Sequence, residues 1–186
     1  HAMERIPERV PVRHAKVEIG SIRGTSSHQY NPAMILCDPA ATEDFGSCYG
    51  FCFAYSGNFV AGAQKDQRGL TRVQMGINPV QFRYTLAAGE AFFAPQVLMS
   101  YSSEGFTGLT HQYHNLIREH ICRGAYKHAK RPVLINNWEA TYFDFDKEKI
   151  VKIAQQAHEL GIEMLVLDDG WFGKRDSDNS GLGDWY

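Results

Sequence analysis

The chain has 186 residues, of which 44% are hydrophobic and 22% are charged, and its formal net charge is -2. This composition is typical of a soluble globular protein and excludes a disordered or fibrous one. The 19 basic and 21 acidic residues form no Lys/Arg block, so we expect no binding to nucleic acid or to an anionic membrane. The longest apolar runs are far shorter than the roughly 20 residues that span a bilayer, so no membrane segment is predicted.

The four cysteines, Cys37, Cys48, Cys52 and Cys122, form no CxxC pair, and no histidines lie at zinc-ligand spacing. The sequence therefore predicts no metal ion and no other cofactor. Cys48 and Cys52 lie four residues apart in a predicted strand, about 13 Å along a straight strand, which is too far for a disulfide. A signal peptide has a basic segment followed by an apolar core, and the amino terminus of this chain has neither. We therefore expect reduced cysteines in a cytoplasmic protein.

Residues 1–105 are rich in predicted strands. Short apolar or alternating runs are separated by turn residues, at the spacing of antiparallel strands in a sandwich. The clearest runs are residues 51–55, 59–61, 82–86, 92–94 and 97–99. We therefore predict a β-sandwich over this part of the chain.

The period of the apolar pattern changes after residue 105. From Thr107 to Arg123 apolar residues recur at helical spacing, and Gly124 follows as a stop signal. We predict one helix here, within a linking segment of residues 106–130.

A different unit is predicted over residues 131–186. The apolar run 132–135 is followed by a loop, a helix capped by Asp146, and a second apolar run, 163–167. A continuous aliphatic run after a helix is typical of a parallel βαβ unit. Because a (β/α)8 TIM barrel needs roughly 200 residues or more, we interpret this unit as the start of a larger α/β domain.

Polar and aromatic residues follow both predicted strands of this unit, over residues 136–142 and 168–173. Ligands of parallel α/β sheets bind at the carboxyl ends of the strands, where these loops begin. Carboxylates and amides bind hydroxyl groups, and indole rings pack on the C–H face of a sugar. The pattern therefore indicates a carbohydrate ligand.

Each candidate also has a purely structural interpretation. Asp168 and Asp169 could cap a helix or hold a turn. Trp138 and Trp171 could be core residues, and Glu139 could be a solvated loop carboxylate. Neighbouring residues on a strand point to opposite faces, whereas the two carboxylates of a glycosidase flank one bond. A binding role therefore suits Asp168 and Asp169 better than a catalytic one.

A close resemblance to bacterial α-galactosidases of glycoside hydrolase family 36 covers most of the chain. It is carried by residues 131–145 with Asn-Asn-Trp-Glu, by 160–175 with Asp-Asp-Gly-Trp, and by 181–185. Residues 56–103 resemble the end of that family's N-terminal β-supersandwich.

The resemblance implies a β-supersandwich that leads through a helix into a (β/α)8 barrel, which hydrolyses terminal α-galactosides with retention. Asp168 and Asp169 match the carboxylates that hold the galactose hydroxyls around O4 and O6, and Trp138 matches an aromatic wall of the galactose pocket. The family's Lys-Trp-Asp nucleophile motif and its acid/base Asp have no counterpart before Tyr186. The resemblance therefore implies an internal fragment with part of the galactose subsite and no catalytic residue, from a full-length homo-oligomer.

The second hypothesis is a non-catalytic carbohydrate-binding or assembly module. Glu139 and the Asp168–Asp169 pair favour the enzyme, because a binding module has no use for the opening strands of a barrel. If the enzyme hypothesis is right, the isolated chain is inactive on α-galactosides. We also predict that Asp168 and Asp169 end a strand parallel to residues 133–135, with Trp138 at the same edge.

Overall fold

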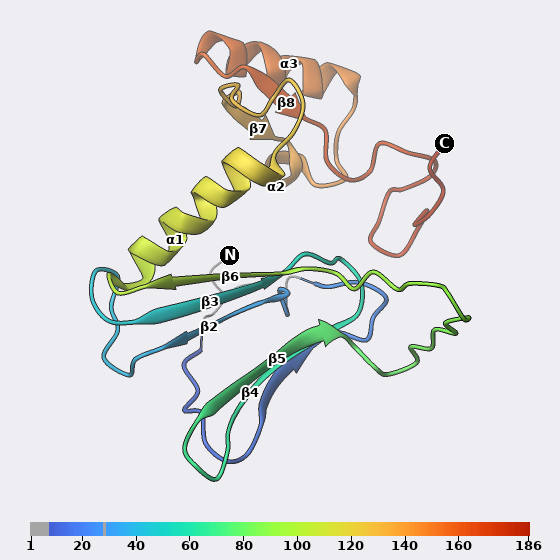
Figure 1. The fold of residues 1–186 in the computed structure, drawn as a ribbon. Helices are drawn as coiled ribbons and strands as arrows, with labels where there is room; N and C mark the ends of the chain where they lie inside the picture. The colour runs from blue at the N-terminus through green and yellow to red at the C-terminus, as the bar shows by residue number, and fades with distance from the viewer. Residues whose placement is uncertain (1–7, 28) are drawn as a thin grey trace. The chain divides into compact units, whose positions relative to one another are not determined.

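The computed structural model describes residues 8–27 and 29–186, and the chain divides into two compact units, residues 1–122 and 123–186. The first unit is built from strands β1 to β6 and helix α1, and the second contains β7, β8, α2 and α3 (Figure 1). None of the helices within the described ranges has the length and apolarity needed to cross a bilayer.

Two antiparallel sheets form the first unit. One has the order β1 (Val17–Gly20), β4 (Phe59–Lys65), β5 (Thr71–Ile77), and the other has the order β2 (Ala33–Cys37), β3 (Cys48–Phe53), β6 (Val97–Ser102). Phe53 of β3 packs with Phe59 and Ala61 of β4, and partly buried side chains from the other four strands close around these three. This core lies between the two sheets, so the predicted β-sandwich character of the first part is confirmed.

Helix α1 (Gly105–Leu116) packs on the sheet β2–β3–β6 and continues as the π-helical turn η2 (Ile117–Ile121). Leu109 joins Cys48 and Ala41 in a second buried cluster. The ring of Tyr113 lies so close to Gly50 that a Cβ added there would be 2.5 Å from it. Glycine is therefore required for α1 to approach β3, and the predicted helix is confirmed with an earlier start.

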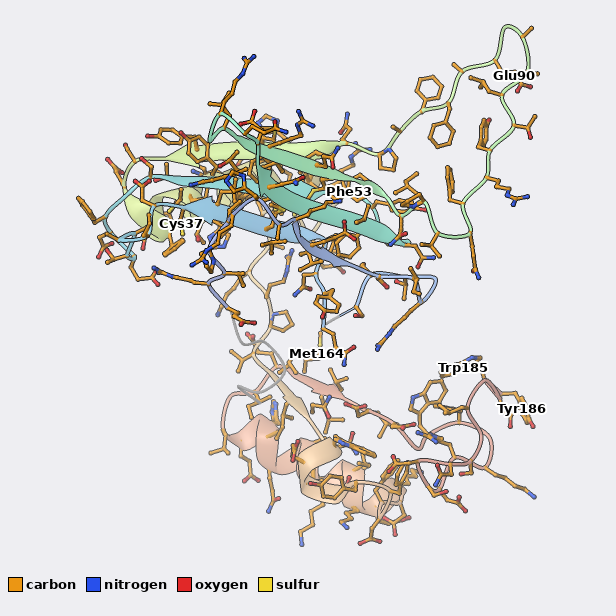
Figure 2. The ribbon with its side chains drawn as sticks, turned by 90° about the horizontal axis from the view of Figure 1, so that it is seen from below. Cys37, Phe53, Glu90, Met164, Trp185 and Tyr186 are labelled. Carbon is orange, nitrogen blue, oxygen red and sulfur yellow. The ribbon has the colours of Figure 1, made fainter. Side chains whose placement is uncertain are left out.

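Two of the predicted strands are wrong. Residues 78–96, which include the runs 82–86 and 92–94, form an excursion without helix or strand. Figure 2 shows Glu90 at its far end, away from the strands of this unit. The rings of Phe82 and Tyr84 contact Phe92 at centroid distances of 6.1 and 4.6 Å. An alternating pattern needs a neighbouring strand to form a ladder, and within the described residues the excursion pairs with none.

The second unit is the predicted βαβ unit. Strands β7 (Leu134–Asn136) and β8 (Met164–Val166) pair in parallel, and α3 (Lys147–Glu159) lies between them in sequence. The short helix α2 (Trp138–Thr141) follows β7. The Asp146 carboxylate caps α3 by accepting a hydrogen bond from Lys149 N–H at 2.8 Å. The loops that follow the two strands therefore leave from the same edge of the sheet.

Candidate functional site

The candidate site lies where the chain leaves β7 and β8. Asn136 is the last residue of β7, and Asp168 follows shortly after the end of β8. The Asn136 side-chain amide donates a hydrogen bond to Asp168 Oδ2 at 2.5 Å, and its oxygen accepts one from Trp138 N–H at 2.8 Å. The predicted parallel strands, with Trp138 and Asp168 at one edge, are confirmed.

The buried side-chain amide of Asn137, the next residue of the Asn-Asn-Trp-Glu motif, joins the loop after β7 to the loop after β8. The side chain of Asn137 is fully buried, and its oxygen accepts a hydrogen bond from Asp168 N–H at 2.8 Å. Its nitrogen donates to the Thr141 hydroxyl at 2.9 Å, and that hydroxyl donates in turn to Asn137 O at 3.1 Å. Asn137 therefore fixes the start of the loop that carries Asp168.

The Asp168 carboxylate keeps free acceptor positions. Oδ1 accepts from Asp169 N–H at 2.8 Å, and Oδ2 accepts from Asn136. An ionised carboxylate can accept about four hydrogen bonds, and residues of the described ranges supply these two. Asp168 is partly exposed, so its remaining positions are open to a ligand hydroxyl.

The Asp169 carboxylate faces a different partner, Arg175. Nε of Arg175 lies 2.9 Å from Oδ1 and 3.1 Å from Oδ2 of Asp169, and Nη2 lies 2.6 Å from Oδ2. Gly170 N–H donates to Oδ1 at 2.8 Å. The hydrogen bonds from Arg175 hold the pKa of Asp169 below its ordinary range, so this carboxylate stays ionised.

Arg175 also organises the loop that follows. Its Nη1 donates to the backbone oxygens of Ser177 and Ser180 at 2.6 and 2.8 Å, and the residue is only 7% exposed. Its guanidinium lies over the Phe143 ring, 5.4 Å from the centroid. Arg175 was not predicted as a site residue, because no local sequence pattern shows which carboxylate a loop arginine will reach.

Trp138 belongs to the same group of contacts. Its ring meets Tyr142 and Phe143 edge-on, at centroid distances of 5.3 and 4.9 Å, and it is only partly buried. Because Phe143 contacts both Trp138 and Arg175, the indole and the Asp169 ion pair are parts of one cluster. The structure therefore brings together Trp138, Asp168 and Asp169.

The two weaker candidates are both exposed. Trp171 is 57% exposed and contacts Phe172 at 5.1 Å, so it is not a core residue of this unit. Glu139 is exposed and accepts a hydrogen bond from the Tyr142 hydroxyl at 3.4 Å.

The chemistry of this site suits a neutral polyol. It offers two differently oriented carboxylates, an amide and a partly exposed indole, which are the groups that bind sugar hydroxyls and C–H faces. In the part of the chain that the structure describes, no group of three or more His, Cys, Asp or Glu side chains could hold a metal ion.

Two family models match the chain. "Glycosyl hydrolase family 36 N-terminal domain" matches residues 1–87, and "Melibiase" matches residues 91–186. The chain belongs to glycoside hydrolase family 36. The resemblance read from the Asn-Asn-Trp-Glu and Asp-Asp-Gly-Trp motifs is thereby confirmed.

Named relatives in the family are α-galactosidases. The chain is 58% identical over 185 residues to the bifunctional α-galactosidase/sucrose kinase AgaSK of Mediterraneibacter gnavus, covering 100% of this chain and 20% of that protein. It is 54% identical over 182 residues to α-galactosidase AgaA of Geobacillus stearothermophilus, covering 98% of this chain and 25% of AgaA.

Solved structures agree with these relationships. The galactosidase domain of AgaSK superposes with a TM-score of 0.88 at 58% identity, over 100% of this chain and 26% of that one. A variant of AgaA in complex with stachyose superposes with a TM-score of 0.87 at 53% identity, over 96% of this chain and 25% of that one. The chain therefore spans about a quarter or less of the length of the relatives it matches.

Proposed function

We propose that this chain is part of a retaining α-galactosidase that hydrolyses terminal α-D-galactosyl residues of galacto-oligosaccharides. The observation that carries the proposal is the cluster of Asp168, Asp169 and Trp138 at the shared edge of β7 and β8. Support comes from relatives that are named α-galactosidases and from structures of AgaA variants in complex with raffinose and stachyose. Both of these sugars end in an α-galactosyl residue.

In this proposal the cluster is one side of the galactose subsite. Asp168 and Asp169 accept hydrogen bonds from the hydroxyls around O4 and O6, and Trp138 packs against the C–H face of the ring. Charge-assisted bonds at fixed positions distinguish the axial O4 of galactose from the equatorial O4 of glucose. The buried amide of Asn137 and the ion pair of Asp169 keep both carboxylates in place.

The bond-breaking groups come from outside residues 1–186 in this proposal. A retaining mechanism needs two carboxyl groups about 5–5.5 Å apart that flank one glycosidic bond. Asp168 and Asp169 turn to different partners, Asn136 and Arg175, and Arg175 contacts both oxygens of Asp169. They are therefore binding residues, and β7, α3 and β8 open a (β/α)8 barrel whose later strands supply the nucleophile and the acid/base.

The test is an activity assay of the full-length protein that contains this segment, beside the isolated 186-residue chain. We expect the full-length protein to release galactose from raffinose and from a chromogenic α-galactoside, and the isolated chain to release none. Proton NMR of the first product should show the α-anomer before mutarotation. No hydrolysis by the full-length protein contradicts the proposal, and the β-anomer as first product contradicts retention.

The proposal includes a cytoplasmic, homo-oligomeric full-length enzyme. Sedimentation equilibrium of the full-length protein checks the assembly, and fractionation of the source cells checks the compartment. A monomer, or activity found outside the cytoplasm, contradicts the corresponding part.

A further inference from the structure

Arg175 is the buried cation of the candidate site, and its contacts join an acidic side chain to the backbone of a loop. It reaches Asp169 through Nε and Nη2, and the oxygens of Ser177 and Ser180 through Nη1. A guanidinium presents its donors in a rigid planar fork that matches a carboxylate, unlike the flexible ammonium of lysine. The direction of the Asp169 carboxylate is therefore set by where Arg175 lies.

The loop closes on Arg175 from several sides. Gly181 has φ +65°, and a Cβ added there would lie 3.2 Å from the backbone N and Cα of Arg175. Gly170 has φ +91°, and a Cβ there would lie 3.1 Å from the Phe143 ring. Phe143 in turn lies under the guanidinium. These contacts hold Arg175 itself in one position.

Arg175 and the backbone leave part of the Asp169 carboxylate open to a ligand. Three N–H groups, Gly170 N, Arg175 Nε and Arg175 Nη2, make four contacts with it, because Arg175 Nε reaches both oxygens. The Asp169 side chain is nevertheless 26% exposed, so a ligand hydroxyl can reach the carboxylate from its open side. Asp168 accepts two hydrogen bonds and so keeps two of the about four acceptor positions of a carboxylate.

We propose that Arg175 is a positioning residue of the galactose subsite, which sets the direction in which the Asp169 carboxylate meets a sugar hydroxyl. This inference rests on the proposed function, in which Asp169 binds galactose. In this proposal Arg175 does not touch the sugar, since four of its five N–H groups are bound to Asp169 and to the loop and its side chain is only 6% exposed. Its effect on the ligand passes through Asp169.

The test compares Arg175→Lys and Arg175→Met in the full-length protein that contains this segment. Lysine keeps the positive charge but has no planar guanidinium to bind both carboxylate oxygens. Methionine keeps an unbranched side chain but has no hydrogen-bond donor. The matched control is Arg131→Met, because Arg131 donates to two backbone oxygens, of Tyr126 and Ala129, and binds no carboxylate of the residues that the structure describes. The readouts are the inhibition constant for free galactose, kcat and the melting temperature.

We expect both Arg175 variants to raise the galactose inhibition constant about tenfold or more. This is the change expected when one well-directed charge-assisted hydrogen bond between Asp169 and galactose is lost. The saturated kcat should change less than the inhibition constant, because the lost interaction serves ground state and transition state alike. Arg131→Met should leave both unchanged. An arginine that only stabilises the loop would lower the melting temperature of its folded variants and leave galactose binding intact.

Asp169→Asn separates this inference from the proposed function. If Asp169→Asn loses galactose binding while folded Arg175→Lys and Arg175→Met retain it, the positioning role is wrong and the proposed function stands. If Asp169→Asn itself binds galactose normally, the proposed subsite is wrong.

A measurement on the 186-residue chain covers the case in which Arg175→Met does not fold. The Asp169 carboxyl carbon is titrated by NMR in the wild type and in Arg175→Lys. Loss of the fork should raise the pKa of Asp169 toward its ordinary range, and an unchanged titration overturns the inference.

Discussion

Two irregular segments, one in each unit, differ in how their polar groups are satisfied. Residues 78–96 in the first unit and 168–181 in the second contain no helix or strand. The first carries exposed aromatic residues, among them Phe93 at 90% exposure, and its rings contact one another. The second is organised around Arg175, which binds a carboxylate and two backbone oxygens.

The two segments differ in what holds their polar groups. Residues 78–96 make local hydrogen bonds, such as those from Phe82 N–H to Pro79 O at 3.3 Å and from Glu90 N–H to Ala87 O at 3.1 Å, and the contacts among their rings add none. A buried donor that binds several acceptors fixes the backbone and the side chains together. Arg175 therefore fixes the polar groups of residues 168–181 relative to one another, as recognition of hydroxyl positions requires.

The largest expected effect concerns Asp169→Ala in the full-length protein. Removing a charge-assisted bond to a buried sugar hydroxyl should lower kcat/KM at least tenfold. The matched control is Asp144→Ala, because the Asp144 carboxylate is exposed and binds only Lys149 among described side chains. Kinetics and melting temperature are measured on the same proteins. A lowered melting temperature with unchanged kinetics would show that Asp169 only holds its loop.

Much of this site follows from local sequence patterns. The apolar runs and the Asp146 cap predict β7, α3 and β8, and a parallel βαβ unit places Trp138 and Asp168 at one edge. Arg175 could not be found this way, because its partner depends on how the loop folds back on itself.

In residues 78–96 local sequence patterns predicted two strands that the structure does not contain. Alternation in residues 82–86 is typical of a strand, yet a strand also needs a partner backbone, which no local pattern supplies. Intrinsic preference alone therefore predicted strands where the structure has none.

The second prediction compares Asn137, the buried amide that binds the start of residues 168–181, with an exposed ring of residues 78–96. Asn137→Ala leaves the buried Asp168 N–H without its acceptor and removes the hydrogen bond that the amide donates to the Thr141 hydroxyl, which should cost about 1–3 kcal/mol of unfolding free energy. Phe93→Ala should change it by less than about 0.5 kcal/mol.

Urea unfolding of the 186-residue chain measures both variants. The three tryptophans all lie in residues 123–186, so their fluorescence follows the second unit, and circular dichroism follows the whole chain. Equal losses of unfolding free energy in Asn137→Ala and Phe93→Ala would contradict the prediction that the buried amide stabilises the chain more than the exposed ring does.

The third prediction uses pH to probe the Asp169–Arg175 pair. Arg175 lowers the pKa of Asp169, so the pair contributes stability above the unfolded-state pKa of about 3.9, and this contribution is lost as pH falls through the folded pKa. Acidification below about pH 4 should therefore destabilise the second unit more in the wild type than in Arg175→Met. Tryptophan fluorescence in urea at a series of pH values checks this, and identical pH dependence would contradict it.

The smallest expected effect distinguishes backbone strain from packing at three glycines with positive φ. Gly181→Ala places a methyl group 3.2 Å from the Arg175 backbone, whereas Gly89 in the excursion and Gly183 have no atom within 4 Å of the added Cβ. All three substitutions force an alanine into the left-handed region, which costs about 1–2 kcal/mol where the backbone cannot relax. Only Gly181→Ala should also displace Arg175, so only it should weaken galactose binding by the full-length protein, by a few-fold. Equal binding in all three variants would mean that the loop tolerates movement of Arg175, and that its rigidity is not what separates it from the excursion.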